Sequence, residues 1–110
     1  MLTIYRENLT VHIFPETNKD YFEYCTALFD DNYTDVIAVI NDGETQYEFE
    51  VWEQRMICYI AERISNSEPV EYESVEELDV TYLINDSPTL NDFINNIVDF
   101  VLEDKEAYDD

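Results

Sequence analysis

His12 is the only histidine in the chain, and it lies within a strand-like run, residues 9–14. A Ser-His-Asp or Cys-His unit would need a nucleophile and an orienting group around this imidazole, and no motif supplies them. A phosphate-binding loop needs several glycines, whereas Gly43 is the only one. We therefore expect no catalytic residue, and we assign His12 a structural or surface role.

Metal and cofactor chemistry has equally little support. The segment Asp30–Asp35 suggests a calcium loop only superficially, because it lacks the central glycine and terminal glutamate of an EF-hand. The spacing of Cys25 and Cys58 fits neither a zinc site nor a redox pair. Their apolar surroundings favour buried free thiols over a disulfide. We expect no metal site, no cofactor and no enzymatic activity; a small enzyme or metal-dependent protein ranks last among the alternatives.

Charge is the most unusual property of this sequence. Its 110 residues include 27 acids and 5 bases, a net charge of −22. No Lys or Arg occurs from Asp20 to Gln54 or from Ile64 to Asp104. Solubility needs a net charge of only roughly 2–8 in magnitude for a small domain. Direct binding to nucleic acid or to an anionic membrane is disfavoured because it requires cations. A positively charged partner is favoured instead.

The rest of the composition predicts one folded domain, residues 1–110. Hydrophobic residues make up 45% of the chain and aromatic residues 15%, enough for a core and unlike a disordered acidic chain. We expect no signal peptide and no membrane span, since no basic segment precedes an apolar one and no apolar run is long enough. The expected location is the cytoplasm, that of the host cell if a phage encodes the protein.

The clearest local structure is a hairpin around Asp42-Gly43, a strong turn signal between two apolar runs. We expect its strands at residues 36–40 and 44–52. In the second strand Thr45, Tyr47, Phe49 and Val51 alternate with polar residues. This period of two predicts one buried face and one solvated face.

The remaining elements follow from periodicity and caps. We expect strands at 2–5 and 9–14 (or one long bent strand), a short edge strand at 70–73 and a strand at 80–84. We expect helices at 18–29, capped by Asn18, at 53–66, and from Ser87-Pro88 to about 104, with 105–110 frayed. A capping-box pattern over 74–77 predicts a helical turn, and 30–35 a polar loop. The fold class is α+β: an antiparallel sheet of about four or five strands covered by two or three helices.

Acidic side chains recur at regular intervals on three of these segments. Neighbours on one helix face lie about 5–6 Å apart, and alternate strand residues about 6.6–6.8 Å apart. These spacings are comparable to the phosphates of duplex DNA, which carries a charge about every 3.4 Å of axis per strand. A single row is usually just a solvated face, but the net charge favours a function. The candidate partner-binding residues are Glu44, Glu48, Glu50, Glu71, Glu73, Glu76, Glu77, Asp92, Asp99, Glu103 and Glu106.

Tyrosines lie among these acids and could stack on arginine side chains of a partner. They are Tyr33, Tyr47, Tyr72 and Tyr108. In size, composition, tyrosine content and layout of acids, the whole chain resembles the small acidic proteins of phages and mobile elements that mimic DNA. This class includes anti-restriction proteins, anti-CRISPR proteins and uracil-DNA glycosylase inhibitors. The resemblance rests on these general features and not on a diagnostic motif.

The resemblance implies a stoichiometric inhibitor that binds the basic nucleic-acid-binding surface of a nuclease or similar protein, by mimicry or steric block. An immunity or antitoxin protein for a cationic toxin would share the same physics and differ in its partner. A non-catalytic acidic adaptor domain is the third alternative. The protein could act as a monomer or a homodimer.

Overall fold

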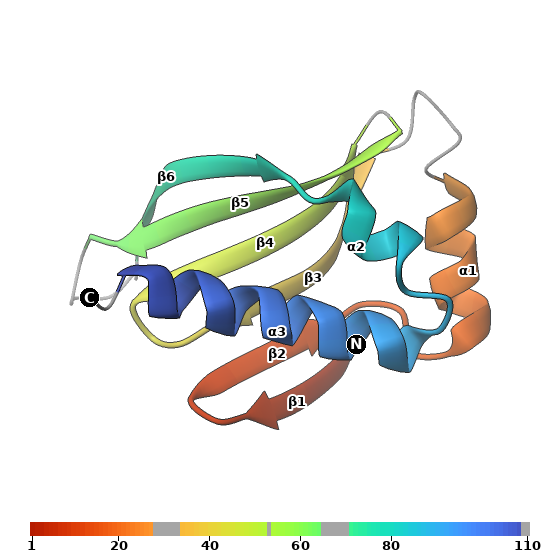
Figure 1. The fold of residues 1–110 in the computed structure, drawn as a ribbon, viewed down its shortest axis with the longest axis horizontal. Helices are drawn as coiled ribbons and strands as arrows, with labels where there is room; N and C mark the ends of the chain where they lie inside the picture. The colour runs from red at the N-terminus through yellow and green to blue at the C-terminus, as the bar shows by residue number, and fades with distance from the viewer. Residues whose placement is uncertain (28–33, 53, 65–70, 109–110) are drawn as a thin grey trace.

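The centre of the fold is an antiparallel sheet in which each strand pairs with the strand before it in sequence, in the order β1-β2-β3-β4-β5-β6 (Figure 1). The computed structural model describes residues 1–27, 34–52, 54–64 and 71–108. The elements in this part of the chain are β1 (Leu2–Arg6), β2 (Leu9–Ile13), α1 (Asn18–Ala27), β3 (Thr34–Asn41), β4 (Thr45–Trp52), β5 (Arg55–Arg63), β6 (Tyr72–Asp79), α2 (Thr81–Asn85) and α3 (Leu90–Tyr108). The α+β class is confirmed, with six strands where four or five were expected.

Both predicted hairpins are present. Strands β3 and β4 pair around the turn at Asp42, whose Oδ1 accepts hydrogen bonds from the amides of Glu44 and Thr45 at 2.9 and 2.7 Å. Gly43 has φ +96°, a backbone conformation that residues other than glycine rarely adopt. Strands β1 and β2 form a second hairpin, so the alternative of one bent strand is wrong.

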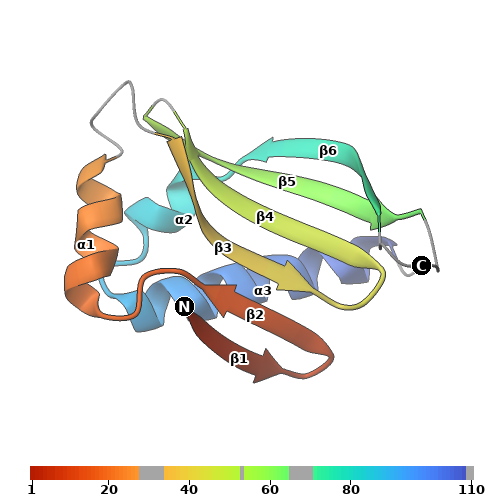
Figure 2. The ribbon, with the colours of Figure 1, turned by 180° about the vertical axis from the view of Figure 1, so that it is seen from behind.

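The molecule has two layers. Helices α2 and α3 lie against one face of the sheet, and α1 stands at its end beside the start of α3 (Figure 1). Seen from behind, the other face is covered by no helix of the described chain (Figure 2); we call it the open face. Alternate residues of the strands and the apolar stripe of α3 fill the space between the layers, as where Phe49 meets Phe100 edge to face at 6.1 Å.

The largest correction concerns β5, where we expected a helix over residues 53–66, of which 53, 65 and 66 lie outside the described residues. Met56, Cys58 and Ile60 are buried with a period of two, and the strand pairs with β4 on one side and β6 on the other. Ile57, on the opposite side of the strand, is buried as well. An apolar pattern on both sides imitates a helical face, but ladder bonds along two edges stabilise the strand.

In the segment that follows, the structure has a strand where we expected a helical turn and a helix where we expected a strand. The predicted helical turn at 74–77 is part of β6, a longer edge strand than the one expected at 70–73. The predicted strand at 80–84 is the short helix α2. The side chain of Asp79 accepts bonds from the amide and hydroxyl of Thr81, and this local turn starts the helix.

Helix α1 is confirmed over its described residues, but its cap is Thr17, whose Oγ1 accepts a bond from the amide of Asp20. Helix α3 is capped by Thr89 in the same way, through the amide of Asp92. The predicted caps join the helices instead: Asn18 Oδ1 accepts a bond from the Leu90 amide at 2.9 Å. Ser87 donates to a carbonyl of α2, and its own carbonyl accepts the hydroxyl of Tyr21 at 2.6 Å.

Helix α3 continues through residue 108, past the end expected near 104, and residues 109–110 of the segment expected to fray lie outside the described residues. Of the predicted loop at 30–35, residues 30–33 lie outside the described residues, while Thr34 and Asp35 belong to β3. The last part of the predicted first helix, 28–29, is outside them as well. Within the described chain, no helix combines the length and apolar character needed to cross a membrane.

Candidate functional site

The open face brings together acids from three neighbouring strands around one tyrosine. Tyr59 of β5 lies opposite Glu48 of β4 on one side and opposite Glu77 of β6 on the other. Glu50 lies two residues along β4 on the same face. Directly opposed residues in an antiparallel sheet have Cβ atoms about 4.5–5.5 Å apart. We call Glu48, Glu50, Tyr59 and Glu77 the open-face cluster.

Negative charges in this cluster act on one another. Partial burial raises the pKa of Glu50, and the carboxylates of Glu48 and Asp35 raise it further. The pKa of Tyr59 is raised by burial and then by Glu50, Glu77 and Glu48. The charged forms are therefore disfavoured by like-charge repulsion as well as by lost hydration, and a nearby cation would offset the repulsion.

Arg55, at the margin of this cluster, partly offsets the negative charge of the acids. The guanidinium of Arg55 stacks over the ring of Trp52 at 5.0 Å, across the β4–β5 pair. Its charge opposes the rise in the pKa of Tyr59 and contributes to the lowered pKa of Asp79, where hydrogen bonds from Thr81 are the larger cause. The open face thus already shows how it accommodates an arginine, namely beside an aromatic ring and acids.

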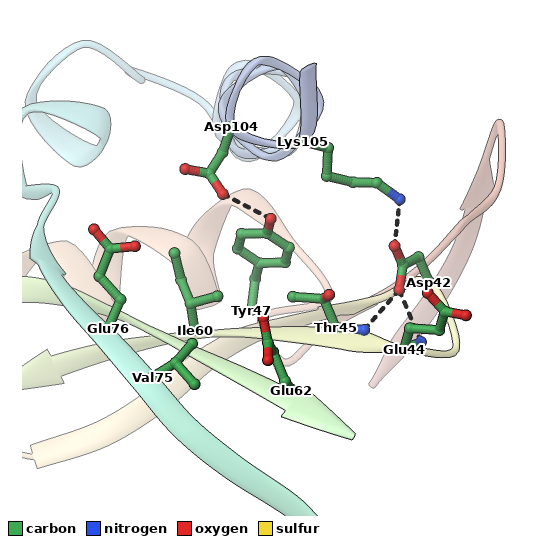
Figure 3. Close-up of a pocket in the computed structure, with 10 residues that line it drawn as sticks. All are labelled: Asp42, Glu44, Thr45, Tyr47, Ile60, Glu62, Val75, Glu76, Asp104 and Lys105. Carbon is green, nitrogen blue, oxygen red and sulfur yellow. Dashed lines mark hydrogen bonds and ion pairs between the residues drawn. The ribbon is translucent and has the colours of Figure 1, made fainter. Parts of the chain in front are cut away.

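A second acidic region is a corner pocket of about 490 Å³ between the β3–β4 turn and the end of α3 (Figure 3). Its lining is Asp42, Glu44, Thr45, Tyr47, Ile60, Glu62, Val75, Glu76, Asp104 and Lys105. The hydroxyl of Tyr47 donates to Asp104 Oδ2 at 2.8 Å, and Lys105 forms an ion pair with Asp42. These two contacts join the last turns of α3 to the sheet.

Burial and charge shift the pKa values here in opposite directions. Burial raises the pKa of Asp42, but hydrogen bonds from Lys105 and two backbone amides, with the charge of Lys105, outweigh it, so the pKa is lowered. Burial raises the pKa of Tyr47, and the Asp104 carboxylate raises it further. Asp42 therefore stays charged and Tyr47 stays a neutral donor, as a structural joint requires.

The predicted acids of 44–50 and 71–77 divide between these two regions. Glu48, Glu50 and Glu77 lie on the open face. Glu44 and Glu76 line the corner pocket instead. Glu73 lies opposite Glu62, which lines the corner pocket, and Glu71 is exposed just before β6.

The acids of α3 occupy the other side of the molecule. Asp99, Glu103 and Glu106 are exposed along the helix, and we call them the helix row. Asp92 does not belong to this row, because it pairs with Thr89 at the helix cap. Since α3 packs on the face of the sheet opposite to the open face, a flat partner surface cannot contact the helix row and the open-face cluster together (Figures 1 and 2).

Of the four tyrosines proposed for stacking, the structure describes the side chains of Tyr47 and Tyr72, and neither is fully exposed. Tyr47 is buried, as its place on the buried face of β4 predicts, so it cannot stack on a partner. Tyr72 is half-buried and accepts a bond from Asn41 Nδ2 at 2.8 Å. Tyr33 and the side chain of Tyr108 lie outside the described residues. Tyr59, which was not predicted, occupies the position among acids expected of the others.

His12, Cys25 and Cys58 form no reactive arrangement with one another. His12 Nδ1 lies 3.3 Å from the hydroxyl of Thr3, on the opposite strand of the β1–β2 hairpin. Both cysteines are free, as predicted, but only Cys58 is buried, whereas Cys25 is half-buried. Burial raises the pKa of both, that of Cys58 to about 12, so neither provides a thiolate near neutral pH. Among the described residues, no three His, Cys, Asp or Glu side chains are grouped to hold a metal ion.

Three residues of these regions were missed in the sequence. Asp104 follows Ile97 and Val101 on the inward stripe of α3, so its spacing was a usable signal. Asp42 was predicted as a turn residue, but nothing in the sequence indicated its ion pair with Lys105. The position of Tyr59 between acids could not be predicted, because its segment was expected to be a helix.

Comparisons of the chain with protein-family models, with curated proteins and with solved structures found no match. No residue can therefore be assigned a role by alignment. The charged surfaces are the features from which function can be inferred.

Proposed function

We propose that this protein is a stoichiometric inhibitor that binds the positively charged nucleic-acid-binding surface of a target protein. A CRISPR effector nuclease or a restriction enzyme is a suitable target, blocked by DNA mimicry or by steric occlusion. The protein acts by binding, without catalysis or a cofactor, in the cytoplasm of the host cell. The observation that carries this proposal is the open-face cluster.

The geometry of this cluster suits a basic groove. Along β4, Glu48 and Glu50 are separated by roughly 7 Å, and Glu48 and Glu77 lie two strands apart, roughly 10 Å. This makes a two-dimensional array of carboxylates whose backbone positions the ladder already fixes, so that binding has to order only the side chains. Tyr59 at its centre offers a ring for an arginine, as Trp52 already does for Arg55.

The crowding of like charges adds a driving force. The raised pKa of Glu50 shows that its negative charge is disfavoured by burial and by neighbouring carboxylates. A lysine or arginine of the target would relieve that repulsion on binding. Because the whole chain carries a net charge of −22, association would be steered over long range and weakened by salt.

A salt-dependent capture experiment tests this function. The immobilised protein is incubated with bacterial lysate at low salt, and bound proteins are eluted with increasing salt and identified. We expect a nucleic-acid-binding protein that elutes as salt rises. When purified, it should lose nucleic-acid binding on titration, with an endpoint at equimolar inhibitor.

Two outcomes would change the proposal. Retention of a cationic toxin, neutralised at the same stoichiometry, would make the protein an immunity protein. If no nucleic-acid-binding protein or toxin is retained even at low salt, the inhibitor proposal is wrong, and an acidic adaptor domain becomes the better description.

A further inference from the structure

The two edges of the sheet differ in how they are protected against pairing with another strand. The edge strand β6 carries Glu73, Glu76, Glu77 and Asp79, and its register with β5 shifts between Ile60 and Ala61. Charged side chains and bulges are the usual means by which an edge avoids pairing. A second copy of this acidic chain therefore cannot add to β6.

The opposite edge has neither protection. Strand β1 (Leu2–Arg6) has one charged residue, Arg6, at its end, and its register with β2 is unbroken over all five residues. Tyr5 is 74% exposed on this edge. Within the described chain, only β2 pairs with β1, so the outer side of β1 is free to pair.

Of the two edges of the described sheet, charge favours this one as the place where two copies meet. Over residues 2–13 the charged side chains are Arg6 and Glu7, which balance, with His12 neutral. The rest of the chain carries the whole excess of acid. Two molecules of net charge −22 repel each other in most orientations, and least with their β1–β2 hairpins facing.

The hairpin geometry fixes which backbone groups of β1 face outward. Arg6 and Leu9 close a two-residue turn in which Glu7 has φ +54°, the positive value that such tight turns require at the first central position. The closing pair of such a hairpin is hydrogen-bonded, and the pattern alternates along the strand. Leu2, Ile4 and Arg6 therefore bond to β2, while the amides and carbonyls of Thr3 and Tyr5 point to the free edge.

We propose that β1 pairs antiparallel with β1 of a second copy across a twofold axis at Ile4, joining two sheets into one of twelve strands. In this register Thr3 of each copy faces Tyr5 of the other as a hydrogen-bonded pair, and Ile4 faces Ile4 as a non-hydrogen-bonded pair. It is the only symmetric register that satisfies the outward groups and pairs all five residues of β1.

A five-residue strand makes a small interface, so the dimer is weak and depends on concentration. Its salt dependence has the opposite sign to that of target binding. Salt screens the repulsion between two acidic copies, with a Debye length falling to about 3 Å at 1 M, and so strengthens the dimer. The dimer is independent of the inhibitor proposal, and either can fail without the other.

Sedimentation equilibrium of the full chain over a range of protein and salt concentrations tests the dimer. We expect a monomer–dimer equilibrium whose association constant rises with salt. Tyr5→Glu, which adds a charge to the paired edge, should weaken association at least tenfold. The matched variant Tyr82→Glu, at a tyrosine that is 52% exposed on α2, should leave it unchanged.

Cysteine cross-linking tests the register. Non-hydrogen-bonded antiparallel pairs bring Cα atoms to about 4.5 Å, within the disulfide range of about 4.4–6.8 Å. Under mild oxidation Ile4→Cys should therefore form a covalent dimer, and Thr3→Cys, which faces Tyr5 and not itself, should form much less.

Three results would overturn the proposal. One is a monomer at every concentration and salt, and another is equal cross-linking of the two cysteine variants. The third is a dimer that Tyr5→Glu leaves intact. If the protein stays monomeric and Tyr5→Glu weakens capture of a target instead, the edge receives a strand of that target.

Discussion

The open-face cluster and the helix row carry similar charge on opposite sides of the molecule, but they hold it differently. In the cluster, acids from neighbouring strands converge on Tyr59, and burial together with like charge raises the pKa of Glu50. In the helix row, Asp99, Glu103 and Glu106 are exposed along one line. Cross-strand pairing therefore concentrates charge in two dimensions, whereas a helix disperses it into solvent, where water and salt screen it.

The strongest test of this difference is reversal of charge on each side. In Glu48→Lys/Glu50→Lys/Glu77→Lys we expect affinity for the captured target to fall by about 100-fold or more, as when close charge pairs across an interface are lost. The matched variant Asp99→Lys/Glu103→Lys/Glu106→Lys changes the net charge equally and should lose less than about tenfold, through weaker steering. Affinity is measured by titration at fixed salt, and circular dichroism checks the fold. Equal losses in the two variants would show that net charge alone governs binding.

A smaller effect is expected where the two layers join at the corner pocket. Tyr47→Phe removes the donor to Asp104 and leaves that carboxylate without this bond, so we expect a loss of about 1–2 kcal/mol in the free energy of unfolding. Urea denaturation measures it, with the exposed Tyr82→Phe as control. A variant as stable as the wild type would mean that the bond contributes nothing to the attachment of α3.

The smallest effect concerns the repulsion within the cluster itself. Glu50→Gln should increase the free energy of unfolding by about 0.5 kcal/mol at neutral pH and low salt, the scale of like-charge pairs in sheets. A carboxyl with a raised folded-state pKa destabilises the fold at pH values above that pKa and no longer does so below its ordinary value, about 4.5. The gain should therefore disappear as the pH falls through this window, and shrink with salt.

The control for this prediction is Glu103→Gln, on the helix row. Because Glu103 is exposed on α3, its substitution should change stability little at any pH. If both variants gain equally, the crowding on the open face is no greater than the general repulsion of an acidic surface, and the contrast between the two sides fails.

Much of this fold could be predicted from local chemistry. The β3–β4 hairpin and the apolar stripe of α3 were visible because turn residues and periodicity agreed there. Strand β5 was mistaken for a helix because Ile57 is buried on the side opposite Met56 and Cys58, so no clean alternation remained. What selects the strand is pairing with β4 and β6, which is tertiary information.

That one error determined how much of the candidate site was visible. Every acid of the open-face cluster was a candidate from its residue type alone. Their convergence could not be predicted, because it requires Tyr59 to lie on a strand between Glu48 and Glu77. Glu76 and Glu77 lie on opposite faces of the sheet because they are neighbours on the pleated strand β6. The helical turn predicted for this segment did not indicate that separation.

The order of the sheet has a consequence for how the chain folds as it is synthesised. Each strand finds its partner immediately before it, so hairpins can form one after another as the chain emerges. The element that covers their apolar side, α3, follows all six strands in the described chain and is therefore made after them. Until it docks, Val11, Phe49 and Cys58 are exposed on a growing sheet, a species prone to aggregation. Messenger or ribosome defects that release chains lacking α3 should therefore yield insoluble product, not a shorter inhibitor.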